Sequence, residues 1–298
     1  MSKTRLDSNG MHWFDRKTGL NILLDEVAVP SSLWAAAPRF VSIAITNACD
    51  LHCEYCYAPK SAHTLPAEAI WRWADELDAN GCLGIGLGGG EPTLHPRFFD
   101  MCERILDSTD LAVSVTTHLN RLSEPAIDRL SEVSSFVRVS MDGVGATYEK
   151  LRQRDFATFF KKLNYLGNRM RIGINFVVND DTFGDLDAAT QLASDIGIAE
   201  FALLPQVATA SVEKLSTELI ERLREWLCGY SGHLQLSISE TSVPKGVSVA
   251  NPFASSCDSY AHVDATGRLK FNSYETLGVQ IVDSGFMSAY QQLCGEFK

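Results

Sequence analysis

Residues 49–56 read CDLHCEYC and place three cysteines, Cys49, Cys53 and Cys56, on one short stretch of chain. A structural zinc site uses four ligands, commonly as two separated pairs. A disulfide framework is typical of short secreted chains with an even number of cysteines. Neither arrangement explains three thiols on one loop of this chain of 298 residues. Three thiolates instead suit a 4Fe–4S cluster that keeps one iron open for a small ligand.

Composition limits the partners that we expect. The chain has 26 basic and 37 acidic residues, a formal net charge of −11. Nucleic acid is therefore not expected as a partner, because no basic excess is available to neutralise phosphates. The N-terminus lacks the apolar segment of a secretory signal, and no apolar run reaches the length that spans a bilayer. We expect a cytoplasmic protein without membrane association, where clustered cysteines are more often metal ligands than disulfides.

Strand-like and helical segments alternate through the centre of the chain. Strands are expected over 41–46, 83–87, 111–116, 136–141, 171–178 and 200–204. Helices are expected over 66–78, 97–106, 123–134, 147–166, 181–196 and 213–227. Six strand–helix units in series predict the α/β class with a parallel sheet, built as a partial (β/α)6 TIM-like barrel.

Two segments outside this alternation are expected to form β-hairpins. Residues 12–24 would turn at Thr18–Gly19, and residues 260–272 would turn at Thr266–Gly267. We therefore divide the chain into an N-terminal hairpin extension (1–38), a barrel core (39–208) and a C-terminal helix with a small extension (209–298).

The sequence places two motifs after neighbouring strands. The cysteine stretch directly follows the first strand of the core, and LGGGEPT (residues 87–93) directly follows the second. Because ligands bind at the carboxyl ends of parallel strands, we expect both motifs to face the same site.

Together these motifs resemble the radical S-adenosylmethionine (radical SAM) superfamily, over roughly residues 40–206. The match comprises the C-x3-C-x2-C spacing, Tyr55 before the last cysteine, and the Gly-Gly-Glu-Pro segment. The resemblance implies that Cys49, Cys53 and Cys56 ligate one 4Fe–4S cluster, whose open iron chelates S-adenosylmethionine. Reductive cleavage of S-adenosylmethionine would then give a 5′-deoxyadenosyl radical that abstracts hydrogen from an unactivated C–H bond.

The resemblance also implies contacts with S-adenosylmethionine. The backbone beside Tyr55 would meet the adenine, the glycine segment would hold the methionine amino group, and later strand ends would contact ribose or carboxylate. The implied contacts are Tyr55, Gly89, Gly90, Glu91, Thr116, Ser140 and Asn175. Since backbone must approach the ligand closely at the glycines, we expect valine at Gly90 to block the ligand while the cluster stays intact.

Several residues have simpler interpretations. A partial zinc site with His52 or His63 is the alternative for the cysteine loop. The pair Asp142–Gly143 is typical of a plain turn, and His118 of a loop residue. Two further cysteines, Cys82 and Cys102, lie among apolar residues and are expected to be buried free thiols.

The C-terminal region resembles a SPASM or twitch-like extension, which in many relatives binds extra clusters. That extension begins C-x(9–15)-G-x4-C around a hairpin. Here Cys257 and Gly267 fit, but Asn272 stands where the second cysteine is expected, and only Cys294 follows. Two cysteines are too few for an auxiliary 4Fe–4S cluster. We expect a degenerate extension, in which Cys257 is either a leftover thiol or a hydrogen-atom donor.

These features favour hydrogen abstraction from a peptide during the maturation of a ribosomal peptide natural product, by backbone excision, crosslinking or epimerisation. The N-terminal hairpin offers a strand edge for a peptide beside the open mouth of the barrel. A small leader-binding partner protein and an electron donor such as flavodoxin or ferredoxin would be required. The alternative is a radical SAM dehydratase or epimerase acting on an aminosugar or nucleoside. The intact Gly-Gly-Glu-Pro segment argues against a non-enzymatic iron–sulfur module.

Overall fold

The computed structural model describes residues 2–209, 211–239, 244–247 and 259–296. The strands are β1 (Ser2–Asp7), β2 (Gly10–Asp15), β3 (Asn21–Leu24), β4 (Phe40–Thr46), β5 (Gly84–Gly89), β6 (Ala112–Thr117), β7 (Phe136–Ser140), β8 (Ile172–Val178), β9 (Glu200–Pro205), β10 (Leu236–Ile238), β11 (Tyr260–Val263), β12 (Arg268–Lys270) and β13 (Val279–Gln280). The helices are α1 (Ala67–Ala79), α2 (Phe98–Ser108), α3 (Glu124–Glu132), α4 (Ala146–Arg152), α5 (Phe156–Gly167), α6 (Leu186–Asp195), α7 (Thr217–Gly229) and α9 (Phe286–Glu296), with 3-10 turns η1 (Ser31–Leu33), η2 (Pro92–Leu94) and η3 (Phe183–Asp185).

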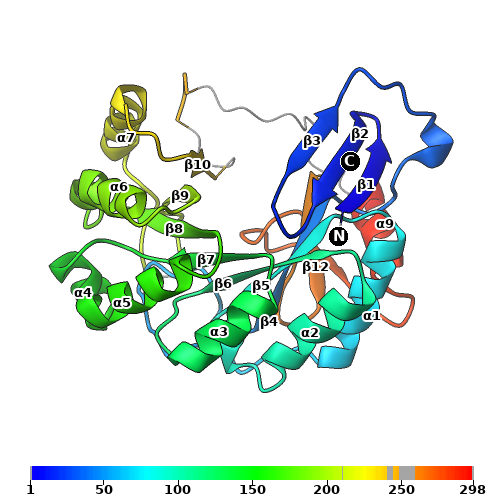
Figure 1. The fold of residues 1–298 in the computed structure, drawn as a ribbon, viewed down its shortest axis with the longest axis horizontal. Helices are drawn as coiled ribbons and strands as arrows, with labels where there is room; N and C mark the ends of the chain where they lie inside the picture. Colours follow the sequence, from blue (N-terminus) through cyan, green and yellow to red (C-terminus); the bar gives the residue numbers. More distant parts are fainter. Residues whose placement is uncertain (1, 210, 240–243, 248–258, 297–298) are drawn as a thin grey trace.

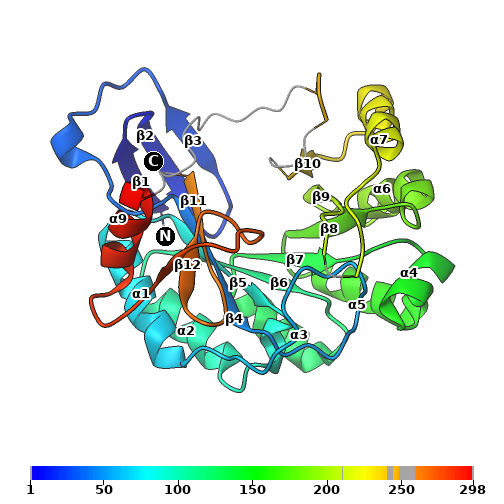
Figure 2. The same cartoon turned by 180° about the vertical axis from the view of Figure 1, so that it is seen from behind.

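One large sheet forms the centre of the molecule, in the order β10-β9-β8-β7-β6-β5-β4-β11-β12-β13. Neighbouring strands are parallel from β10 through β4 to β11, whereas β12 and β13 are antiparallel. The sheet curves, and helices cover its convex side (Figures 1 and 2). The prediction of an α/β partial barrel is confirmed, and β10 and β11 extend it at its two edges.

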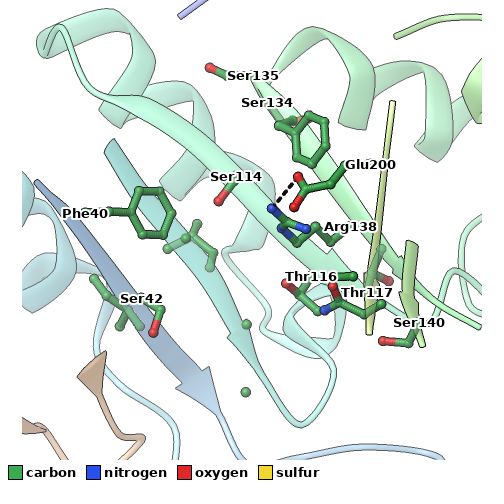
Figure 3. Close-up of a pocket in the computed structure, with 18 of the residues that line it drawn as sticks. Phe40, Ser42, Ser114, Thr116, Thr117, Ser134, Ser135, Arg138, Ser140 and Glu200 are labelled. Carbon is green, nitrogen blue, oxygen red and sulfur yellow. Dashed lines mark hydrogen bonds and ion pairs between the residues drawn. The ribbon is translucent and has the colours of Figure 1, made fainter. Parts of the chain in front are cut away.

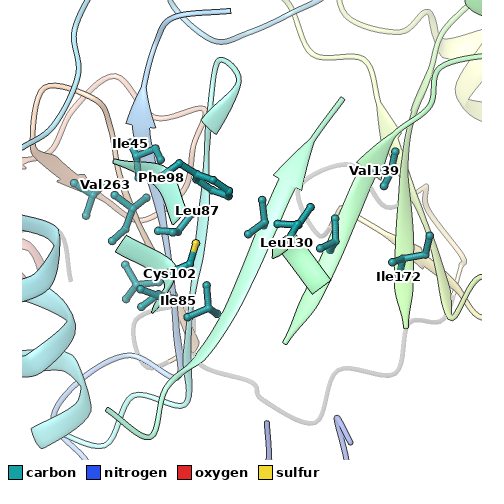
Figure 4. Close-up of a cluster of buried hydrophobic side chains, with 14 of the residues drawn as sticks. Ile45, Ile85, Leu87, Phe98, Cys102, Leu130, Val139, Ile172 and Val263 are labelled. Atoms are coloured by element: carbon teal, nitrogen blue, oxygen red, sulfur yellow. The ribbon is translucent and has the colours of Figure 1, made fainter. Parts of the chain in front are cut away.

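The strands alternate large aliphatic residues with small or polar ones. In β4, Val41, Ile43 and Ile45 are fully buried on the side covered by helices. Figure 4 shows Ile45 with Ile85, Leu87 and residues of the outer helices in the same apolar layer. The alternate positions of β5 are Gly84, Gly86 and Gly88. A TIM barrel usually fills its interior with branched side chains; here small residues leave the inside hollow.

The N-terminal segment forms a separate antiparallel sheet in the order β1-β2-β3. The expected hairpin of residues 12–24 is confirmed as β2 and β3, while β1 was not predicted. Arg16 donates to the carbonyls of Thr109 and Leu111, which precede β6. This sheet therefore lies at the amino ends of the barrel strands. The expectation that this hairpin lies beside the open mouth of the partial barrel stays a prediction, and the cysteine loop lies away from it, after the carboxyl end of β4.

The helix expected over 147–166 is two helices. Helix α4 ends at Arg152, and Gln153 follows with a left-handed φ of 52°. The Asp155 carboxylate then accepts a hydrogen bond from the Thr158 backbone at 2.7 Å and caps α5. An Asp at this N-cap position favours a new helix start, so the chain turns directly after Arg152.

The C-terminal segment joins the barrel sheet. The expected hairpin of residues 260–272 is confirmed, with β11 and β12 paired around Thr266–Gly267. The division of the chain at residues 38 and 208 stays a prediction, and Cys257 lies outside the described residues. In the part of the chain that the structure describes, every helix is too short or too polar to cross a bilayer.

Candidate active site

A cavity of about 1440 Å³ occupies the inside of the partial barrel. The cysteine loop lines one end, and the turn at Thr18 and Gly19 lines the other. Serine and threonine side chains project inward from the strands, and Arg138 pairs with Glu200 at 2.7 Å on the wall formed by β7 and β9 (Figure 3). The cavity is therefore polar and large enough for a cofactor together with part of a substrate.

All three cysteines of the loop line this cavity. Cys53 is buried, and Cys49 and Cys56 are half-buried free thiols. Burial raises the pKa of the Cys49 thiol, and metal coordination would offset this by binding the thiolate. Among the described residues that line the cavity there is no fourth cysteine. This donor set fits a 4Fe–4S cluster with one open iron.

The glycine segment (residues 88–91) forms backbone hydrogen bonds with the residues that lead into the cysteine loop. The Gly90 amide donates to the Thr46 carbonyl at 2.7 Å, and the Glu91 amide donates to the Ala48 carbonyl at 2.7 Å. Gly89 has a φ of 129°, and a Cβ there would lie 2.1 Å from the Thr46 oxygen. Glycine is thus required for backbone-to-backbone packing, in addition to any approach of a ligand.

Glu91 lies behind this segment. Its carboxylate is fully buried and accepts hydrogen bonds from the Thr93 hydroxyl at 2.6 Å, the Thr117 hydroxyl at 2.7 Å and the His118 amide at 2.9 Å. It is not among the described residues that line the cavity. Glu91 therefore joins the end of β5 to the end of β6, and its expected contact with a methionine amino group stays a prediction.

The other residues expected at strand ends face the cavity. Thr116 of β6, Ser140 of β7 and Asn175 of β8 all line it, together with Gly89 and Gly90. Ser140 and Asn175 are paired across β7 and β8. The structure thus brings these residues and the three cysteines to one cavity, as expected from the parallel topology.

Tyr55 is hydrogen-bonded to Asp142, for which the sequence indicated only a turn. Its hydroxyl donates to the Asp142 carboxylate at 2.6 Å, and the Val177 amide donates to the other carboxylate oxygen at 2.8 Å. Arg152 forms an ion pair with the same carboxylate. Gly143 does form the expected turn, with a φ of 85°. However, Asp142 is fully buried and joins the cysteine loop to β7 and β8.

A second polar group lies beside Cys49. His118 Nε2 is 2.9 Å from Asp50, and one ligand atom from each of Cys49, Asp50 and His118 lies within 4.8 Å of the others. Burial opposes the charge on Asp50, but His118 and Arg154 hold its pKa below the ordinary value. His63 instead contacts Ser61 at 2.9 Å. The structure therefore brings His118 close to Cys49, whereas the side chain of His52, within the cysteine loop, is exposed.

A neutral polar group faces the cavity from β4 and β11. The register pairs Ser42 with His262 and Phe40 with Tyr260. Ser42 Oγ lies 2.6 Å from His262 Nδ1 and 2.5 Å from the Tyr260 hydroxyl. Burial, with Lys270 nearby, lowers the pKa of His262 to about 4. His262 is therefore neutral at physiological pH.

The sequence profile of the Radical SAM superfamily matches residues 43–193, which span the cysteine loop, the glycine segment and strands β4 to β8. The chain belongs to the radical SAM superfamily. Members of this superfamily use a 4Fe–4S cluster and S-adenosylmethionine, and the cavity-facing cysteines supply the matching thiols.

Individual proteins give the following similarities. The sporulation killing factor maturation protein SkfB of Bacillus subtilis is 31% identical over 140 residues, which cover 44% of this chain and 33% of SkfB. A GTP 3′,8-cyclase of Ectopseudomonas mendocina is 26% identical over 212 residues, 62% of each protein. This chain thus spans less than two thirds of either relative. Streptococcus suis SuiB bound to its precursor peptide SuiA superposes with a TM-score of 0.77 at 13% identity, covering 97% of this chain and 88% of that one, which shows a shared fold.

Proposed function

We propose that this radical SAM protein is an enzyme that reductively cleaves S-adenosylmethionine and directs the resulting 5′-deoxyadenosyl radical to a peptide. Cys49, Cys53 and Cys56 ligate the 4Fe–4S cluster. The observation that carries the proposal is the placement of these three thiols at one end of a hollow barrel, against the glycine segment. When bound, the cluster would supply the electron for the cleavage, and the strands of the partial barrel would surround the reacting groups.

The proposed S-adenosylmethionine site uses residues around the cluster end of the cavity. The backbone beside Tyr55 meets the adenine, and the backbone of Gly89 and Gly90 holds the methionine amino group. Polar contacts come from Thr116, Ser140 and Asn175, which line the cavity at the ends of successive strands. Glu91 supports the glycine segment through its buried hydrogen bonds.

A peptide substrate is supported by the comparisons and by the shape of the site. SuiB, which shares this fold, was crystallised with a precursor peptide, and SkfB is named as a maturation protein. The cavity reaches from the cysteine loop to the N-terminal turn. A peptide would lie along this cavity, because the N-terminal sheet is at the opposite end from the cysteines. We propose maturation of a ribosomal peptide by excision, crosslinking or epimerisation.

The cofactor part of the proposal is tested without a substrate. Anaerobically reconstituted protein should hold about four irons per chain, as one 4Fe–4S cluster requires. Changing Cys49, Cys53 and Cys56 together to alanine should remove nearly all of this iron. Reduced wild-type protein should release 5′-deoxyadenosine from S-adenosylmethionine, and failure to do so with a full cluster would refute this function.

The substrate part is tested with deuterium. A candidate precursor peptide, carrying deuterium at carbon, should transfer the label to 5′-deoxyadenosine when mixed with the reduced enzyme. Deuterated GTP and a deuterated aminosugar are the alternative probes, since similarity to a GTP 3′,8-cyclase extends over 62% of the chain. Label from either small molecule, with none from the peptide, would replace the peptide proposal with the small-molecule alternative.

The edge strand β3 is the proposed first contact for the peptide. It pairs with β2 on one side only, and Ile22 and Leu24 of β3 are exposed, as is Leu20 just before it. Strand addition to such an edge is a common mode of peptide binding. We expect Ile22→Asp to weaken peptide modification at least tenfold while uncoupled S-adenosylmethionine cleavage continues. Ile22→Val is the matched control, and equal rates for both variants would exclude this contact.

A further inference from the structure

Arg152 is buried beside the cysteine loop although it belongs to neither family motif. It is the last residue of α4, and the chain turns immediately after it. Its side chain is 10% exposed and forms an ion pair with Asp142, which is 1% exposed. Arg152 also lines the same cavity as the three cysteines.

One hydrogen-bond donor of Arg152 has no partner among the described residues. The Nε atom is buried and contacts no acceptor there. A buried donor without a partner is costly, and a redox or catalytic role is one of the explanations for such a group. The guanidinium also lies over the Tyr55 ring, 6.0 Å from its centroid. Arg152 thus presents a free N–H and a positive charge next to the loop between Cys53 and Cys56.

Neighbouring groups stabilise the positive charge on Arg152. Burial disfavours the guanidinium cation, but Asp142, Tyr55 and Cys53 outweigh this effect and raise the pKa of Arg152. Asp142 is in turn held by Tyr55 and by the Val177 amide. The cavity wall at the cysteine loop therefore carries a guanidinium–carboxylate pair, and the side chains of both members are largely buried.

We propose that Arg152 and Asp142 set the reduction potential of the cluster held by Cys49, Cys53 and Cys56. Reduction adds one negative charge to the cluster. A nearby guanidinium stabilises the reduced form, and a hydrogen bond to a cluster or cysteine sulfur acts in the same direction. The Asp142 carboxylate has the opposite effect. This inference rests on the cluster site of the proposed function.

The two charges predict opposite shifts. Arg152→Gln should lower the ratio of reduced to oxidised cluster about tenfold at a fixed potential, which is 59 mV for a one-electron couple. Asp142→Asn should raise the potential, because the negative charge is gone. The asparagine oxygen can still accept the hydrogen bond from the Val177 amide, so the local structure should be kept. Arg152→Lys keeps the charge but lacks Nε–H, so its potential should lie between those of the wild type and Arg152→Gln.

The experiment is a redox titration of reconstituted protein, followed by the electron paramagnetic resonance signal of the reduced cluster. Arg138→Gln is the matched control, since Arg138 is also paired with a carboxylate inside the barrel, and its potential should equal that of the wild type. If Arg152→Gln does not retain a cluster, Tyr55→Phe replaces it, because losing the hydroxyl leaves Asp142 less neutralised and should lower the potential slightly.

The outcomes separate the two proposals. Wild-type protein that binds no cluster would refute the proposed function. A normal cluster whose potential moves in the same direction in the arginine and aspartate variants would overturn this inference alone, because a purely structural role would affect both variants alike. Unchanged potentials in both variants would overturn it as well.

Discussion

Gly90 lies against Ala48 so closely that a Cβ on Gly90 would be 2.3 Å from the Ala48 carbonyl oxygen. The Asn47 carbonyl oxygen would be 2.6 Å away. Both carbonyls belong to the chain that leads into Cys49. The expectation that valine at Gly90 leaves the cluster intact stays a prediction, but this geometry argues against it, since the added bulk would meet the backbone of the cysteine loop before it meets any ligand.

The first prediction follows from this contact. Gly90→Val should displace the loop and reduce the iron bound after reconstitution to well under half of the wild-type amount. Iron and sulfide analysis measures this directly. Gly184→Ala is the control, because a Cβ there meets no atom within 4 Å. Full iron content in Gly90→Val would show that the loop can move aside without losing its ligands.

The second prediction uses the neighbouring glycine. A Cβ at Gly88 would meet only the Thr116 Cβ, at 3.9 Å, and Gly88 lines the cavity. Gly88→Val should therefore keep a full cluster and fill space inside the barrel. We expect weaker S-adenosylmethionine binding and at least tenfold slower 5′-deoxyadenosine release. Normal release with normal binding would place the ligand elsewhere in the cavity.

The fold was predictable because its signals are local and periodic. Each core strand, such as 41–46 or 111–116, is an apolar run followed by a helical segment, and parallel topology alone brings the two motifs together. The hollow interior is also visible in the alternation of Ile85 and Leu87 with Gly84, Gly86 and Gly88.

The polar networks were not predictable, because they depend on contacts between distant residues. Asp142 and Gly143 have the composition of a turn, and nothing nearby in sequence indicates Tyr55, which is 87 positions away. The position of Arg152 at a helix end was not predictable either, because the sequence predicted one helix that continues to residue 166. The pairing of Ser42 with His262 depends on β11 joining β4, an edge contact that no local pattern encodes.

The third prediction concerns Glu91. Its buried carboxylate accepts from Thr93, Thr117 and the His118 amide. Glu91→Gln would place an amide N–H₂ where these donors converge and leave buried groups unpaired, at a cost of about 1–3 kcal/mol. Denaturant unfolding of the cluster-free protein, followed by circular dichroism, measures this loss. Unchanged stability together with weaker S-adenosylmethionine binding would instead make Glu91 a direct ligand contact.

The fourth prediction is a pH dependence of stability that arises from His262. Burial, with Lys270 facing it, lowers its pKa to about 4 from 6.5, while Asp264 acts weakly in the opposite direction. Between these two values the unfolded chain binds a proton that the folded chain does not, so stability rises with pH across this window. This residue alone should make the free energy of unfolding about 2 kcal/mol smaller at pH 5 than at pH 7.

His262→Asn isolates this contribution, because the asparagine oxygen can still accept a hydrogen bond from the Ser42 hydroxyl but does not titrate in this range. Urea unfolding of the cluster-free protein at pH 5 and pH 7 gives the difference for both proteins. The variant should lose about 2 kcal/mol less than the wild type on acidification. An equal loss in both would mean that His262 is protonated in the folded barrel, and that the group formed with Ser42 and Tyr260 carries a charge into the cavity.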